Sequence, residues 1–139
     1  MRTYGQYCGL AAAMDLVGQR WAMLIIRDLA PGPRRFTDLF AGLPGIATDM
    51  LADRLRALEA AGVIRQHSIK HPAPAKLYEL TESGQELARL AADLAGWGQR
   101  LLPAPGTTEA TVQPRWALQS MAARYQGGAA AGVYHLVID

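Results

Sequence analysis

Positive charge gathers in one stretch of this chain, where the residue types could bind an anion. No acidic residue lies between Glu59 and Glu79, whereas five basic or imidazole side chains fall in that interval: Arg65, His67, Lys70, His71 and Lys76. A second basic pair, Arg34 and Arg35, lies further upstream. Such a cluster suits the phosphates of a polyanion, which position a protein without carrying sequence information.

A second group of residues has the chemistry to read nucleic-acid bases. Asp49, Asp53 and Arg56 fall on one face when successive residues are turned by about 100°, as in a helix. Arginine can donate to O6 and N7 of guanine, a carboxylate can accept from N4 of cytosine, and Thr48 could contact bases or phosphate. An acid beside phosphates would favour selectivity over affinity. The alternative is that Asp49 and Asp53 serve only the helix dipole and solubility.

Cys8 is the single cysteine of the chain, and it stands just before a predicted helix. A thiol at a helix N-terminus can have a lowered pKa and react as the thiolate, which makes Cys8 a candidate sensor of oxidants or electrophiles. One cysteine excludes an internal disulfide framework and indicates a reducing compartment. The alternative is an inert cysteine buried between two subunits.

The elements that must position these residues form a helix-turn-helix pattern. Residues 36–40 predict a short helix, and Pro44 and Gly45 predict the turn that follows. The second helix begins after the turn, with Thr48 as its N-cap and Gly62 as its left-handed C-terminal residue. Its inward face is formed by Leu51, Leu55 and Leu58. Two earlier helices, residues 10–17 and residues 21–29, complete the core, and the second of them is apolar nearly all round.

Beyond Gly62 the hydrophobic period changes to two. Residues 63–68 and 77–80 predict two strands around the loop "KHPAPAK". Two strands directly after a helix-turn-helix make a β-hairpin wing. The predicted fold class is therefore mainly α with a small β-hairpin (α+β), a winged helix-turn-helix.

A long helix follows the wing, with Thr81 or Ser83 as its N-cap. Its apolar residues recur at intervals of three and four, and they are Leu87, Leu90, Leu94, Trp97 and Leu101. This spacing predicts a coiled-coil-like seam and a symmetric dimer through the terminal helices. The alternative is a helix docked on its own domain's core.

The domain organisation follows from composition. Residues 1–102 form the winged helix-turn-helix and dimerisation domain, and residues 103–113 form a linker. Residues 114–139 predict a helix that begins at Pro114 and a strand, and the strand needs another sheet edge as a partner. The chain of 139 residues has a net charge of +2, and its apolar segments are too short for a membrane span, so we expect a cytoplasmic protein without membrane contact.

Several motifs together give the chain a family resemblance. They are Asp15-x-x-Gly18-x-Arg20-Trp21, Arg35-Phe36-x-x-Leu39, Pro44-Gly45-Ile46, Leu51-x-x-Arg54-Leu55 and Leu80-Thr81-x-x-Gly84, with Cys8 ahead of them. Through residue 102 the chain resembles the HxlR-type (DUF24) winged-helix transcription regulators, relatives of the MarR group. The resemblance implies a homodimeric repressor or activator that binds double-stranded DNA at a short inverted repeat.

The same resemblance bears on regulation. In several such regulators the N-terminal cysteine senses oxidants or quinones, and Cys8 matches its position, so the expected effector is a small apolar or electrophilic molecule. Asp49 and Ala52 depart from the residues common in the family, which leaves the operator sequence open. The segment from Arg115 resembles the start of a sterol-carrier-like domain.

Two other functions are alternatives to a DNA-binding regulator. The sequence contains no Gly-rich phosphate loop, catalytic acid pair or serine nucleophile motif, so no enzyme activity or cofactor is expected. His67 and His71 lack the further ligands of a metal site, and we expect no bound metal. The second alternative is a drug- or metabolite-binding protein whose DNA affinity is secondary. Such a protein would show no binding when it is titrated with duplex DNA.

Overall fold

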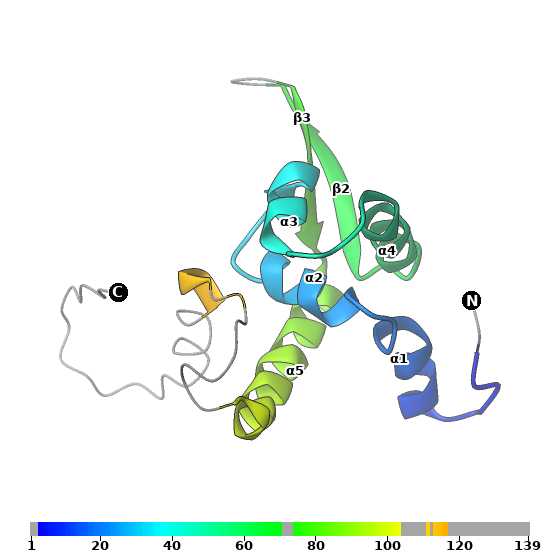
Figure 1. Ribbon diagram of the computed structural model, residues 1–139. Helices are drawn as coiled ribbons and strands as arrows, with labels where there is room; N and C mark the ends of the chain where they lie inside the picture. Colours follow the sequence, from blue (N-terminus) through cyan, green and yellow to red (C-terminus); the bar gives the residue numbers. More distant parts are fainter. Residues whose placement is uncertain (1–2, 71–73, 104–110, 112, 117–139) are drawn as a thin grey trace, which may run out of the picture. The chain divides into compact units, whose positions relative to one another are not determined.

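The structure is a computed structural model that describes residues 3–70, 74–103, 111 and 113–116 (Figure 1). The chain divides into two compact units, Met1–Ala91 and Ala92–Asp139, which are described separately. His71, most of the predicted linker and the tail from residue 117 lie outside the described residues. The predictions on those segments, and the domain boundaries themselves, therefore stay predictions.

The first unit follows the predicted order of helices and strands. Its elements are α1 (Gly9–Val17), α2 (Ala22–Leu29), β1 (Arg34–Arg35), α3 (Phe36–Gly42), α4 (Thr48–Ala60), β2 (Ile64–Ile69), β3 (Ala75–Leu80) and the first part of α5 (Glu82–Gly98). The strands form an antiparallel sheet in the order β1-β3-β2. The winged helix-turn-helix fold class is confirmed, and the short strand β1 is an addition to it.

The core forms where α2, α3 and α4 meet the base of the sheet. Its fully buried side chains include Ile25, Ile26, Leu29, Leu39, Leu43, Leu51, Leu55, Leu58 and Ile64. The helix α2, predicted as apolar nearly all round, buries Ala22, Ile25, Ile26 and Leu29, whereas its Leu24 is 41% exposed. Within the described residues, Asp28 of the same helix is a buried charged residue, and its carboxylate pairs with Arg27 Nη2 at 2.9 Å.

The ends of α4 differ in how far the sequence predicted them. At the C-terminus Gly62 has φ +72, as predicted. The N–H of Gly62 bonds to the carbonyl of Glu59 and that of Val63 to Leu58, which is the Schellman arrangement. The predicted N-cap is wrong by one position, because Ala47 is the N-cap and Thr48 is the first helical residue.

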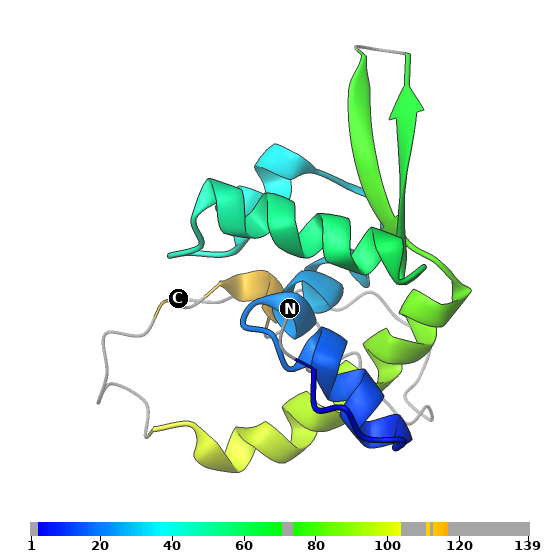
Figure 2. The same cartoon turned by 90° about the vertical axis from the view of Figure 1, so that its right-hand side faces the viewer.

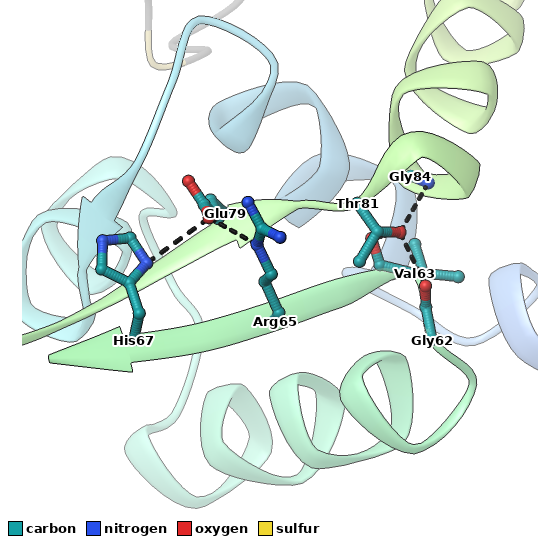
Figure 3. Close-up of polar contacts among 7 residues, drawn as sticks. All are labelled: Gly62, Val63, Arg65, His67, Glu79, Thr81 and Gly84. Atoms are coloured by element: carbon teal, nitrogen blue, oxygen red, sulfur yellow. Dashed lines mark hydrogen bonds and ion pairs between the residues drawn. The ribbon is translucent and has the colours of Figure 1, made fainter.

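The wing is tied to α5 by a compact polar junction, drawn in Figure 3. The backbone N–H of Gly84 donates to Thr81 Oγ1 at 3.2 Å, so Thr81 rather than Ser83 caps the helix. The same hydroxyl donates to the carbonyl of Gly62 at 2.6 Å, which links the cap to the end of α4. A Cβ placed on Gly84 would lie 2.1 Å from the carbonyl oxygen of Val63, so only glycine fits there.

The second unit contains the end of α5 and the 3-10 helix η1 (Gln99–Leu101). Arg100 donates from Nε to the carbonyl of Trp97 at 3.0 Å, and its guanidinium lies 5.5 Å from the centroid of that indole ring. Further along, residues 114–116 are helical, in keeping with a helix that begins at Pro114.

Within the described ranges, no single helix is long and apolar enough to cross a membrane. The consecutive helices α1 and α2 reach the required length and composition only as a pair, and they are bent by 81° at their junction. Ile25, Ile26 and Leu29 of α2 belong to the buried core described above.

Candidate nucleic-acid interface

The outer face of α4 carries the three residues predicted to read bases. Asp49, Asp53 and Arg56 are all exposed, and Thr48 beside them is exposed as well. The leucines of the opposite face are at most 2% exposed. The predicted orientation of α4 is therefore confirmed, whereas contact of these side chains with DNA stays a prediction.

The acids on this face already have partners within the helix. Arg56 donates from Nη2 to Asp53 Oδ1, one turn earlier on the same surface. Asp49 Oδ1 accepts a hydrogen bond from the backbone N–H of Met50 at 2.9 Å. The second contact supports the alternative in which Asp49 stabilises the helix N-terminus. The first contact means that the guanidinium of Arg56 is held by a neighbouring acid before any DNA arrives.

The wing presents its cations on the two strands of the hairpin and directly after β2. Lys70, Lys76 and Arg65 are exposed. Arg65 donates from Nε to Glu79 Oε1, and His67 Nδ1 lies 3.5 Å from the same oxygen, as Figure 3 shows. The strand register explains this arrangement, because Arg65 pairs with Glu79 across the hairpin. The sequence pattern treated Glu79 only as the boundary of the basic stretch, and the pairing of strands turns it into a counter-ion.

The two arginines of the upstream basic pair differ in burial and in contacts. Arg34 and Arg35 form β1, opposite Tyr78 and Leu77 of β3. Arg34 is partly buried and donates from Nε to the carbonyl of Asp28 at 2.7 Å. Arg35 is exposed beside the start of α3. Arg34 thus contributes to the fold at the end of α2, and a role for either arginine at a phosphate stays a prediction.

Cys8 is the N-cap residue of α1 and is exposed in the single chain. The backbone N–H groups of Ala11 and Leu10, in the first turn, lower the pKa of the Cys8 thiol from its ordinary value. A lower pKa increases the thiolate fraction at neutral pH, and the thiolate is the reactive form. The environment is consistent with a reactive cysteine.

The predicted seam of α5 is divided between the core and the surface. Leu87 is partly buried and packs against the core of the first unit, as the alternative of a docked helix requires. The remaining seam residues are exposed: Leu90 by 62%, Leu94 by 53%, Trp97 by 52% and Leu101 by 67%. The α-helix ends at Gly98, and Leu101 belongs to η1, so the seam is not one continuous α-helix as predicted.

Two further cationic residues lie close together where α4 meets the turn between α1 and α2: Arg54 belongs to α4, and Arg20 belongs to the turn. Arg54 of α4 donates from Nε to the carbonyl of Arg20 at 3.1 Å. The guanidinium of Arg20 lies 5.1 Å from the centroid of the Trp21 ring. Neither arginine belongs to the basic clusters of the sequence, and only the packing of the turn against α4 brings them together.

For metal binding, the described part of the chain contains no group of three His, Cys, Asp or Glu side chains in reach of one ion.

The chain matches the HxlR-like helix-turn-helix family over residues 16–105. The match spans both helices of the motif, the wing and α5. The chain belongs to this family. It is thus an HxlR-type helix-turn-helix regulator, a class of proteins that bind DNA and are not enzymes.

Two relatives of Bacillus subtilis illustrate the similarity. The HTH-type transcriptional regulator YodB is 32% identical over 99 residues, which cover 71% of this chain and 88% of YodB. The uncharacterized HTH-type transcriptional regulator YvaP is 33% identical over 85 residues, covering 61% of this chain and 79% of YvaP.

Solved structures agree with the fold. The reduced form of YodB superposes with a TM-score of 0.60 at 31% identity, covering 73% of this HxlR-type chain and 99% of YodB. YodB has also been solved with quinone bound, and that structure gives a TM-score of 0.56 at 32% identity over 66% of this chain and 96% of YodB. A putative MarR-family regulator of Porphyromonas gingivalis superposes with a TM-score of 0.65 at 25% identity, covering 73% of this chain and 100% of that regulator.

Proposed function

We propose that this HxlR-type regulator binds duplex DNA by placing α4 in the major groove while the wing contacts the phosphate backbone. The observation that carries the proposal is the orientation of α4, which buries three leucines and presents Asp49, Asp53 and Arg56 to solvent. In a helix-turn-helix the second helix enters the major groove, where arginine and carboxylate side chains can distinguish base pairs.

Affinity is assigned to cations beside this helix. Arg35, Lys70 and Lys76 are exposed, and Arg65 is exposed but shared with Glu79. Contacts of these groups with phosphates would be independent of sequence. Arg34 and His71 complete the predicted set, the former partly buried and the latter outside the described residues.

The binding unit is a homodimer on an inverted repeat, because two recognition helices are needed to reach successive major grooves. Leu90, Leu94, Trp97 and Leu101 provide exposed apolar side chains for such a contact. Burial of these side chains against a second copy would remove an apolar surface that a monomer leaves in water. Access to chromosomal DNA places the protein in the cytoplasm.

Regulation is assigned to Cys8 and to an electrophilic or oxidising effector. Its thiol is exposed, and the first turn of α1 lowers its pKa. The quinone-bound structure of the relative YodB supports an effector of this chemical class. Since the chain has one cysteine, a disulfide would have to join two subunits or a small thiol.

The test is a titration with the duplex that flanks the protein's own gene, at two salt concentrations, followed by footprinting. A DNA-binding regulator loses affinity steeply as salt rises, because phosphate contacts release counterions. A small-molecule carrier would ignore the duplex, and that result would refute the proposal. The effector is tested separately, by adding a quinone to the wild-type protein and to the Cys8→Ser variant. We expect the quinone to abolish DNA binding by the wild type and to leave DNA binding by Cys8→Ser unchanged.

A further inference from the structure

Arg20, at the α1–α2 turn, and Arg54, on α4, differ in their electrostatic surroundings from Arg56 and Arg65. Arg56 is paired with Asp53, and Arg65 is paired with Glu79. Among the ion pairs of the described residues, none involves Arg20 or Arg54. The charges of these two guanidinium groups therefore have no ion-pair partner in the described part of the chain, with Arg20 exposed and Arg54 partly buried.

The acids that are near in sequence make their hydrogen bonds to other residues. Asp15 of α1 accepts hydrogen bonds from Thr3 Oγ1 at 2.7 Å and from the backbone N–H of Tyr4 at 2.9 Å. Asp53 precedes Arg54 in α4, but it points to the outer face and accepts from Arg56. Two cations that lack an ion-pair partner repel each other modestly when they lie close together, and a bound anion would relieve that repulsion.

Both side chains are held in place by contacts that leave donors free. Arg54 uses Nε for the carbonyl of Arg20, so both of its Nη groups are available. The guanidinium of Arg20 stacks on the ring of Trp21. Trp21 is the one non-glycine residue in the described part of the chain that has a positive φ, +79. Because these contacts pre-organise the guanidinium groups, binding an anion would cost little side-chain entropy.

The location of the pair relative to α4 suggests which anion it meets. In both ribbon views the β2–β3 hairpin extends to one side of α4, and the α1–α2 turn lies on the other side (Figures 1 and 2). The major groove is about 12 Å wide and is bounded by one phosphate backbone on each side. A helix in the groove with the wing on one backbone thus brings the α1–α2 turn towards the other.

We propose that Arg20 and Arg54 each bind a phosphodiester group of the DNA backbone, on the side of the groove opposite to the wing. The ligand class fits, since a guanidinium donates several hydrogen bonds in a plane that matches phosphate oxygens. The proposal rests on the function proposed above and extends it. It makes the binding surface two-sided, with α4 between two cationic anchors.

The test measures how the affinity for duplex DNA depends on salt, for the full chain and its variants. Arg20→Gln and Arg54→Gln should each reduce the slope of log K against log salt by about 0.9 for a lost phosphate contact. Between 50 and 200 mM salt, that slope corresponds to roughly a 3.5-fold smaller loss of affinity per contact. The affinities of these variants for operator and for scrambled duplexes should fall by the same factor. Arg89→Gln, at an exposed position of α5, is the matched control and should leave the slope unchanged.

Arg54 also supports the fold through its bond to the turn, so Arg54→Lys is included to retain the charge. We expect Arg54→Lys to keep the wild-type slope. If the glutamine variants bind more weakly with an unchanged slope, the arginines only hold the turn and the proposal is overturned. An equal fall in slope for Arg89→Gln would overturn it as well, because net charge alone would then explain the effect. Absence of salt-dependent binding by wild type would instead refute the proposed function itself.

Discussion

Arg56 donates a hydrogen bond to Asp53 on the outer face of α4, where the side chains of both residues are more than half exposed. The helix that we place in the major groove therefore carries a guanidinium restrained by its own carboxylate. Exposed pairs of this kind contribute little to stability. Their effect on recognition can be larger, because the acid repels phosphates and orients the arginine.

Asp53→Asn should raise the affinity for all duplexes by roughly threefold, since it removes a negative charge beside phosphates and frees Arg56. Arg56→Ala should change the order of preference among base-substituted duplexes, by about tenfold at the contacted base pair. Competition binding with a panel of single-base variants measures both effects. A uniform loss of affinity in Arg56→Ala would contradict its role in base reading.

Glu79→Gln should strengthen DNA binding, because it releases Arg65 from its counter-ion on the wing. We expect a gain of a few-fold and a salt slope steeper by up to about 0.9, the value of one added phosphate contact. Lys76→Ala should lower the affinity for DNA and make the salt slope shallower. Glu86→Gln, exposed on α5, has the same charge change and serves as the control. Equal gains in Glu86→Gln and Glu79→Gln would show that Arg65 has no specific part in the effect.

The rate of Cys8 alkylation by iodoacetamide should fall as the pH decreases, because the thiolate becomes protonated. We expect the midpoint of this fall to lie at a lower pH in the folded protein than in the unfolded protein. The backbone amides at the start of α1 lower the pKa of the folded thiol, so the thiolate persists to lower pH. Alkylation of the native protein and of the same protein in urea gives the two midpoints. Because the chain has one cysteine, the label reports on this site alone. Coincident midpoints would show that α1 does not activate the thiol.

Leu94→Glu should yield a monomer with greatly weakened DNA binding, because it places a charge in the exposed apolar surface assigned to the dimer. Light scattering after size-exclusion chromatography gives the mass, and duplex titration gives the affinity. Arg89→Glu introduces the same side chain at an exposed polar position of α5 and should remain dimeric. A dimeric Leu94→Glu variant would exclude this surface as the interface.

Two glycines of α5 should respond in opposite ways to alanine. Gly84→Ala brings a Cβ within 2.1 Å of the Val63 carbonyl oxygen, so we expect the free energy of unfolding to fall by about 3 kcal/mol. Gly96→Ala meets nothing within 4 Å and should stabilise the helix by about 0.5–1 kcal/mol. Urea unfolding followed by circular dichroism measures both. Similar effects at the two positions would contradict the tight junction between the wing and α5.

Local patterns in the sequence were sufficient for the helices of the motif and the orientation of α4. Leu51, Leu55 and Leu58 recur with the period of a helix, and burial of that stripe dictates which residues face outward. The left-handed conformation of Gly62 follows from the steric freedom of glycine at a helix end. These features depend on neighbours a few residues apart, which the sequence displays directly.

The partners of the charged residues were decided by tertiary structure. Glu79 becomes the counter-ion of Arg65 only when β2 and β3 pair in their register. Arg54 meets the carbonyl of Arg20, 34 residues away, only when the α1–α2 turn packs against α4. The sequence shows how many charges a segment carries. Which of them stay uncompensated depends on contacts between distant segments, because electrostatic interactions act through space and fall off with distance rather than with sequence separation.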